Sequence, residues 1–169
     1  MALGANFQAM IRAGIVAPSL YTNSAAEVQQ AVWNIPANFL QAGQSFRVKW
    51  QGIQTASAGV ITLQQLLRLG TTTLTGTQVI AGTATAGAVS NVFSGEFIFT
   101  VRAGPGAAVA IVGHGRYFEP QLIALAVEKR VILATTNFAT NGALVCELNL
   151  KYSAANASES ARVDCFTID

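Results

Sequence analysis

The stretch Leu144-Val145-Cys146-Glu147-Leu148-Asn149-Leu150-Lys151-Tyr152 decides the fold class of this 169-residue chain. Every even-numbered position from 144 to 152 is apolar, whereas positions 147, 149 and 151 carry Glu, Asn and Lys. Successive side chains of a β-strand point to opposite faces, so this alternation predicts a strand with one face in a core and one polar outer face.

The same alternation recurs on both sides of this stretch. Phe46, Val48 and Trp50 alternate with polar residues, and residues 97–101 repeat the design with Phe, Phe and Val. Six weaker strand candidates are rich in β-branched or aromatic residues: Val28–Ile35, Val60–Leu69, Thr77–Thr85, Ala107–Phe118, Ala126–Ala134 and Arg162–Ile168. Turn-forming clusters separate them, among them Gln41–Gln44, Gly70–Gly76, Gly104–Gly106 and Asn137–Gly142. About nine short strands without helical segments between them predict an all-β fold, a jelly-roll-like antiparallel β-sandwich.

The first residues do not follow the strand pattern. Residues 2–13 have the spacing of a short amphipathic helix, and Pro18 would end it. We assign residues 1–17 to a short N-terminal arm and residues 18–169 to a single β-sandwich domain. A frayed terminus without a role is the alternative for the arm.

Charge is scarce along the whole chain. Charged residues make up 11% of the sequence, against about 25% in ordinary soluble proteins, and the apolar set stands at 51%. A net charge of +2, with no three consecutive Lys or Arg residues, is too small for a protein that neutralises phosphates, so no nucleic-acid partner is expected. A surface with so few charges is poorly protected against association with other protein molecules. We therefore expect the protein to be part of a larger assembly.

No targeting or membrane segment is evident. The longest uninterrupted apolar stretches, Ala107–Val112 and Leu122–Val127, have six residues each, whereas a membrane helix needs about 20. The first 20 residues lack the pattern of a secretory signal, so synthesis in a host cytoplasm without secretion is expected. Cys146 and Cys165 both fall in predicted strands. Two buried thiols are favoured over a disulfide, which stays open as the alternative.

The sequence offers little for catalysis. The single histidine, His114, lies in a predicted strand and is better explained as a strand residue than as a general base. The eight acidic residues are scattered, and phosphate-loop, dinucleotide, calcium and zinc motifs are not found. We therefore expect a protein that is not an enzyme, with no catalytic, cofactor-binding or metal-binding residue and no cofactor.

Aromatic residues could also serve as binding groups. Arg47, Lys49 and Trp50 resemble a single-strand nucleic-acid platform, but alternation puts Trp50 on the face opposite to both cations. A carbohydrate-binding module would expose several Trp or Tyr rings. This chain has two Trp and three Tyr residues, mostly at positions expected to be buried.

One segment resembles a known group of proteins. Leu20–Gly52 contains Ile35-Pro36-Ala37-Asn38-Phe39-Leu40-Gln41-Ala42-Gly43, followed by Arg47-Val48-Lys49-Trp50-Gln51-Gly52. This pattern resembles tailed-bacteriophage virion structural proteins of β-sandwich or jelly-roll type, which serve as capsid decoration (cement) proteins, head fibres or tail appendages. The resemblance covers about 33 of the 169 residues and carries over no functional residue.

The same segment has its own physical interpretation. Pro36 cannot donate a hydrogen bond to a strand ladder, so it turns the chain out of a sheet. Asn38 suits a turn, Gly43 accepts a positive φ, and Phe39 with Leu40 would close one end of the sandwich. The segment is therefore predicted to be a corner between two sheets.

Together these observations predict a virion structural protein. The expected role is a capsid decoration protein that binds the assembled shell as a homotrimer, with the major capsid protein or other virion proteins as partners and no membrane. A head or tail fibre or a tail-tip protein is the second hypothesis, and a carbohydrate-binding sandwich the third. Residues 1–17 and Thr71–Ala88 are the candidate contact regions. Thr71–Ala88 is interpreted either as a mobile hairpin tip or as an edge strand of weak register.

Overall fold

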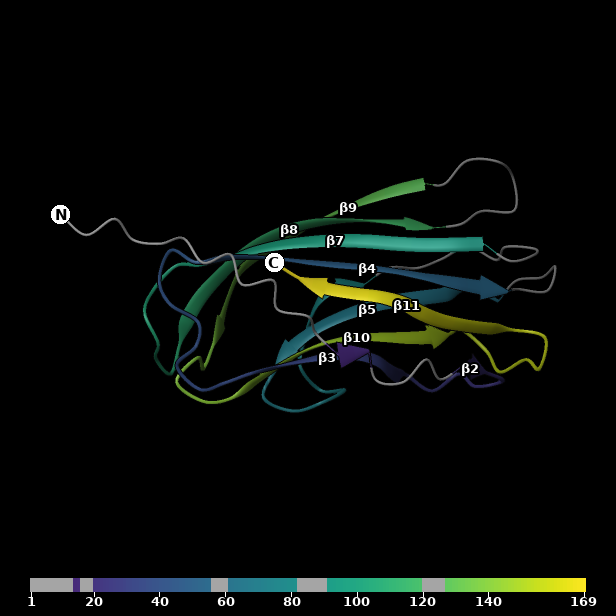
Figure 1. Cartoon of the computed structure of the whole chain (residues 1–169), viewed down its shortest axis with the longest axis horizontal. Helices are drawn as coiled ribbons and strands as arrows, with labels where there is room; N and C mark the ends of the chain where they lie inside the picture. Colours follow the sequence, from purple (N-terminus) through teal and green to yellow (C-terminus); the bar gives the residue numbers. More distant parts are fainter. Residues whose placement is uncertain (1–13, 16–19, 56–60, 82–90, 120–126) are drawn as a thin grey trace.

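Two antiparallel sheets form the fold in the computed structural model, which describes residues 14–15, 20–55, 61–81, 91–119 and 127–169 (Figure 1). The five-stranded sheet has the order β1-β3-β10-β5-β6. Its strands are β1 (Gly14–Ile15), β3 (Val28–Ile35), β10 (Leu144–Tyr152), β5 (Leu63–Gly70) and β6 (Thr77–Ala81). The six-stranded sheet has the order β2-β11-β4-β7-β8-β9. Its strands are β2 (Tyr21–Thr22), β11 (Ser160–Ile168), β4 (Ser45–Thr55), β7 (Asn91–Val101), β8 (Val109–Glu119) and β9 (Val127–Phe138).

The described residues contain strands and no helix, so the predicted all-β sandwich is confirmed. The chain crosses between the sheets from β3 to β4 to β5 and again from β10 to β11, which gives the winding a jelly-roll-like character. Strands β7, β8 and β9 instead run as a meander within one sheet. In Figure 1 this meander forms the edge of the molecule farthest from β3.

Most predicted strands lie where the alternation put them. Two of the differences have a clear cause. β7 begins at Asn91 rather than Phe97, because its pairing with β4 continues as far as Gln54 opposite Asn91. β9 extends to Phe138, into the predicted turn Asn137–Gly142, because Phe138 pairs with Val109 at the start of β8. Gly14 and Ile15 fall within the range assigned to the arm and pair with β3. The rest of residues 1–17, with the predicted helix, lies outside the described residues.

The corner between β3 and β4 is built as its sequence predicts. β3 ends at Ile35, directly before Pro36. Asn38 has a φ of 60° and its backbone N–H donates to the carbonyl of Thr140 at 3.0 Å. Gly43 has a φ of 82° and donates to the carbonyl of Val101 at 2.8 Å. Positive φ is inexpensive only for Gly and, to a lesser degree, Asn, so these two residues fix the corner.

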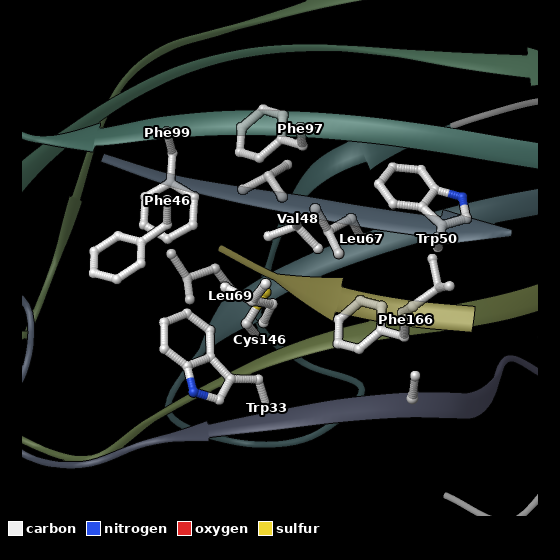
Figure 2. Packing of buried hydrophobic residues seen from close by; sticks show 14 of the residues in the cluster. Trp33, Phe46, Val48, Trp50, Leu67, Leu69, Phe97, Phe99, Cys146 and Phe166 are labelled. Carbon is white, nitrogen blue, oxygen red and sulfur yellow. The ribbon is translucent and has the colours of Figure 1, made fainter. Parts of the chain in front are cut away.

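The described residues of the two sheets share one apolar core. Figure 2 shows Phe46, Val48, Phe97 and Phe99 facing side chains that include Leu67 and Leu69. Alternation assigns either Val32 or Trp33 to the core, and the structure buries Trp33. The other residues that alternation assigns to the core are all buried: Phe46, Val48, Trp50, Leu63, Leu67, Phe97, Phe99, Val101, Val109, Ile111, Leu144, Leu148, Leu150 and Phe166. Their burial supplies the main driving force for folding.

One hydrogen-bonded chain of polar groups crosses this core. The indole N–H of Trp50 on β4 donates to Oε1 of Gln65 on β5 at 2.7 Å. The amide of Gln65 then donates to the carbonyl of Phe118 on β8 at 3.2 Å. Gln65 is 1% exposed, so its partners must come from the protein. It therefore links the two sheets with a directional contact as well as by packing.

Candidate interaction surfaces

The outer face of the six-stranded sheet is a broad surface of apolar and neutral side chains. Register places Ile98 of β7 beside His114 of β8, and His114 beside Ile132 of β9. These residues alternate with core residues on β7 and β8, so their side chains point away from the core. We call this surface the outer face. Its described apolar members are half-buried or exposed: Ile53, Val92, Ile98, Val112, Phe118 and Ile132.

The most exposed of these residues lie at different places on the sheet. Ile132 is 84% exposed on edge strand β9, and Val92 is 56% exposed near the start of β7. Single exposed apolar residues are ordinary on a protein surface. Here half-buried Ile98 and exposed Ile132 lie in register on either side of His114, so neutral and apolar side chains extend across three adjacent strands of the outer face.

The charges on this face are largely balanced by neighbours. Arg47 donates to both carboxylate oxygens of Asp169 at 3.2 and 3.1 Å, and the ammonium of Lys49 lies 3.6 Å from the same carboxylate. Glu96 lies in register between Lys49 and Arg116. Burial alone would raise the pKa of Asp169, but the hydrogen bond from Arg47 and the charges of Lys49 and Arg47 bring that pKa below its usual value. This balance suits a protein partner better than a polyanion.

A second group of polar residues lies on the outer side of the five-stranded sheet. Arg68 donates to the two oxygens of Glu27 at 2.6 and 2.7 Å, and to the carbonyl of Gly76 at 3.0 Å. Asn149 also donates to Glu27, at 2.6 Å. Such a two-pronged guanidinium–carboxylate pair is stronger and more directional than a single ion pair.

The pKa of Glu27 reflects this arrangement. Burial alone would raise it, but hydrogen bonds from Arg68 and Asn149 and the positive charges of Arg68 and Lys151 outweigh burial, so the pKa lies below its usual value. The hydrogen bond to Glu27 raises the pKa of Arg68 in turn, against the opposing effect of burial. Each group therefore keeps its partner charged.

Glu147 connects this group to the turn between β5 and β6. Its carboxylate accepts a hydrogen bond from the backbone N–H of Leu74 and another from the amide of Gln29, both at 2.5 Å. Glu147 is only 1% exposed and Asn149 is fully buried, because the segments that contact them cover the outer side of β10. The alternation of β10 had predicted an open polar face here. That expectation was wrong, since alternation does not show that a distant loop covers a face.

The predicted contact regions are described only in part. Within Thr71–Ala88, residues 71–76 form the turn held by Glu147, and Thr77–Ala81 is edge strand β6, whose register with β5 shifts between Leu67 and Arg68. The described part thus contains both the turn of the β5–β6 hairpin and an edge strand, and the choice between the two alternatives stays open. Residues 82–88, and residues 1–13 and 16–17 of the arm, lie outside the described residues.

The rings that could form a sugar-binding platform are inside the molecule. Trp33, Trp50, Tyr21, Tyr117 and Tyr152 are each at most 5% exposed. Tyr21 and Tyr152 stack with their ring centroids 5.1 Å apart, and the hydroxyl of Tyr21 accepts a hydrogen bond from the backbone N–H of Tyr152. Burial, then the nearby Glu159 and Tyr21, raises the pKa of Tyr152. These rings therefore stabilise the fold rather than present a flat aromatic surface.

The two cysteines lie in different sheets and form no disulfide. Cys146 on β10 is buried, and burial together with the charge of Glu147 raises the pKa of its thiol to about 12. Cys165 on β11 is exposed, so the expectation of two buried thiols is wrong for this residue. β11 has a bulge between Val163 and Cys165, so its alternation shifts there and Phe166, rather than Cys165, faces the core.

His114 is exposed at the centre of the outer face. It alternates with the core residues of β8 and so shares the outer face with Val112, Arg116 and Phe118, and Ile98 and Ile132 flank it in register. Across the described ranges, His, Cys, Asp and Glu side chains nowhere gather in threes that could hold a metal ion. The same ranges contain no helix that is long and apolar enough to span a membrane.

Comparisons with known proteins return only distant structural likenesses. No known protein family matches the sequence, and no curated protein matches it significantly. Among solved structures, a mutant VP2 protein of infectious bursal disease virus, from T=1 particles, is 14% identical over 89% of this chain and 27% of that chain, with a TM-score of 0.32. Structures of the Gt and Gx strains of the virus are 14% and 12% identical, with TM-scores of 0.32 and 0.31. They cover 90% and 89% of this chain.

This chain spans well under half the length of each of these viral chains, 32% and 37% of the Gt and Gx chains. The neighbours are proteins of viral particles, but likeness at this level establishes neither a shared fold nor a shared function.

Proposed function

We propose that this protein is a virion structural protein of a tailed bacteriophage, and specifically a capsid decoration protein that binds the assembled shell as a homotrimer. It performs no catalysis and needs no cofactor. The observation that carries the proposal is the outer face, where apolar and neutral side chains extend over adjacent strands and the charges are locally balanced. The resemblance of Leu20–Gly52 to phage virion proteins supports the same role.

The proposed mechanism is stabilisation by mass action. A protein that binds only the assembled shell shifts the equilibrium away from disassembly, by an amount that grows with its concentration relative to its dissociation constant. Once one subunit of a trimer has bound the shell, the other two subunits are held near their own binding sites at a high effective concentration. The trimer can therefore bind tightly although each of its three contacts is weak. The major capsid protein is the proposed partner.

Labelling of intact virions with an antibody against this chain tests the location. The antibody is expected to decorate the capsid, whereas decoration of a fibre or tail tip would favour the appendage hypothesis. Absence of the chain from purified particles would overturn both proposals.

Thermal disassembly tests the mechanism. Shells stripped of this chain are expected to release their DNA at a lower temperature, and added purified chain is expected to restore the original temperature. Val112→Lys, on the outer face, should weaken restoration about tenfold or more, because burial of an unpaired charge is costly. Gln78→Lys is the matched control, since Gln78 is exposed on β6 in the other sheet. Equal restoration by both variants would remove the outer face from the contact.

A further inference from the structure

One asparagine of the sequence is directly followed by glycine: Asn141, before Gly142. This pair lies in the connection between β9 and β10, which carries the chain from the six-stranded sheet to the five-stranded sheet. Asn141 is exposed and Gly142 is half-buried. Asparagine is a thermolabile residue, and it is least stable before glycine, because no side chain on the following residue shields the backbone nitrogen.

The turn before this pair is held firmly, whereas the groups that can react are free. Buried Thr140 donates its backbone N–H to the carbonyl of Gly106 at 2.9 Å, and its hydroxyl accepts the N–H of Gly106 at 3.1 Å. The carbonyl of Thr140 accepts from Asn38 at 3.0 Å, and the N–H of Asn141 donates to Gly106 at 3.3 Å. Within the described part of the chain, the side-chain amide of Asn141 and the backbone N–H of Gly142 have no hydrogen-bond partner. The side chain can therefore turn toward that nitrogen without breaking a described hydrogen bond.

The exposure and the free groups of this pair point to a covalent modification. We propose that Asn141 is a site of spontaneous deamidation. The backbone nitrogen of Gly142, after losing its proton to water or hydroxide, attacks the side-chain carbonyl carbon of Asn141. A new C–N bond forms, the bond to the side-chain nitrogen breaks, and that nitrogen takes up a proton and leaves as ammonia, so that a five-membered succinimide ring remains. Water then opens the ring at either carbonyl, which gives aspartate or isoaspartate. The net reaction consumes one water and releases one ammonia, and it needs no enzyme, oxidant or cofactor.

The reaction changes the connection between the two sheets in two ways. The new carboxylate takes the formal net charge of the chain from +2 to +1. Isoaspartate also carries the chain through its side-chain carbon, so the backbone gains one atom between Thr140 and Leu144, where β10 begins its pairing opposite Ile35. The hydrogen bonds of Thr140 to Gly106 and Asn38 depend on the length of this segment, so conversion loosens them. This modification is independent of the proposed function.

Timed incubation of the purified chain at mildly alkaline pH tests the site. Peptide mapping by mass spectrometry should find that the peptide with Asn141 gains the mass difference between OH and NH2, and an isoaspartate-specific methyltransferase should label it. Asn137, which is exposed in the same segment but followed by phenylalanine, is the internal control and should stay unmodified. Gly142→Ala is the matched variant, because a Cβ there meets nothing closer than the carbonyl oxygen of Ala139 at 3.9 Å. This variant should keep the fold and react at least about tenfold more slowly, since its methyl group shields the nitrogen.

A synthetic peptide of residues 138–145 gives the rate of the same reaction without the fold. Because the reacting groups are unbonded, the folded protein should react within about tenfold of the peptide, since little local opening is needed. A folded protein that reacts more than about a hundredfold more slowly than the peptide, or that deamidates equally at its other asparagines, overturns the inference.

Thermal unfolding before and after complete conversion measures the effect on the turn. The converted protein should melt at a lower temperature, whereas Gly142→Ala incubated in the same way should keep its original melting temperature. An unchanged melting temperature after complete conversion would contradict the loosening of the Thr140 contacts. None of these results bears on the capsid labelling, so the proposed function is judged separately.

Discussion

Gly95 illustrates how a single residue determines the packing of the core. It pairs with Trp50 on the neighbouring strand β4, and a Cβ added at Gly95 would overlap the Trp50 ring. Glycine is ordinarily unfavourable in a strand because it has no side chain to pack. Here the space above Gly95 holds the ring, and the ring is thereby placed to donate its hydrogen bond to Gln65.

Gly95→Ala is therefore expected to destabilise the protein. The added methyl group must displace the Trp50 ring, and overpacking of this kind costs about 1–3 kcal/mol. Urea denaturation followed by tryptophan fluorescence measures the change in the free energy of unfolding. Gly104→Ala is the control, because a Cβ at Gly104 meets nothing within 4 Å and should change the free energy by less than about 0.5 kcal/mol. Equal effects of the two substitutions would contradict the account of Gly95.

The Glu27–Arg68 pair predicts how stability depends on pH. The pKa of Glu27 is lower in the folded protein than its ordinary value of 4.5, so the folded state holds a proton less readily than the unfolded chain. The stabilisation is therefore fully present above the unfolded-state pKa and is lost as the pH falls through the lower folded-state pKa.

Glu27→Gln should remove this contribution. At pH 7 the variant is expected to lose about 1.5–3 kcal/mol, the usual size of hydrogen bonds to a charged group. The difference from the unmodified protein should narrow between about pH 5 and the onset of acid unfolding, as urea titrations at several pH values can show. Asp164→Asn is the control, since Asp164 and Arg162 form an exposed pair that contributes little. A difference that stays constant down to acid pH would exclude Glu27 as the titrating group.

At the scale of elements, alternation in the sequence was enough to predict strands, faces and core. β3 and β10 have the predicted bounds, and the whole predicted core is buried. Alternation failed where strands are irregular or covered. A bulge in β11 shifts its alternation between Val163 and exposed Cys165, and the β5–β6 turn covers Glu147. Period-two patterns describe one strand at a time, so they contain no information about a distant segment.

The candidate surfaces were predictable to different degrees. The face shared by His114 and Arg116 follows from alternation within β8 alone. The contact of Glu27 with Arg68 joins residues 41 positions apart, and that with Asn149 joins residues 122 apart. Scattered single charges in the sequence gave no signal for this grouping, because it depends on which strands lie side by side.

The assignment of faces on β10 can be tested by one charge. Leu148 is fully buried at the centre of that strand. Leu148→Asp should prevent folding, because the free-energy cost of burying an unpaired carboxylate in an apolar core exceeds the free energy of unfolding of a small domain. Circular dichroism should show loss of the strand signal. Val92→Asp, at an exposed position on β7, should keep the native spectrum. A native spectrum from Leu148→Asp would mean that the faces of β10 are reversed.

For the molecule as a whole, the structure shows how the few charges are distributed over the surface. Several of the charges at the surface are used in local pairs, such as Arg47 with Asp169, Arg68 with Glu27 and Arg162 with Asp164. Between the charges, the described outer face carries apolar and neutral side chains, among them Ile98, Val112 and Ile132. Paired charges contribute less repulsion between copies than free ones do, so this distribution favours association with like or neutral surfaces.

The two sheets are also expected to unfold as one unit. Trp33 lies on β3 in the five-stranded sheet and Trp50 on β4 in the six-stranded sheet, yet both are buried in the same core. Gln65 adds a hydrogen-bonded link between the sheets, so neither sheet can open without exposing the other. A shared core of this kind is typical of cooperative, two-state unfolding.

Two variants with a single tryptophan test this cooperativity. Trp33→Phe leaves Trp50 to report on the six-stranded sheet, and Trp50→Phe leaves Trp33 to report on the five-stranded sheet. In each variant the fluorescence transition in urea should coincide with the far-ultraviolet circular dichroism transition of the same sample, whatever its midpoint. Trp50→Phe should also have the lower midpoint, because it leaves the side-chain carbonyl of Gln65 without its donor inside the core. Separate fluorescence and circular dichroism transitions in either variant would show that the sheets unfold independently, and the link through Gln65 would then have no energetic importance.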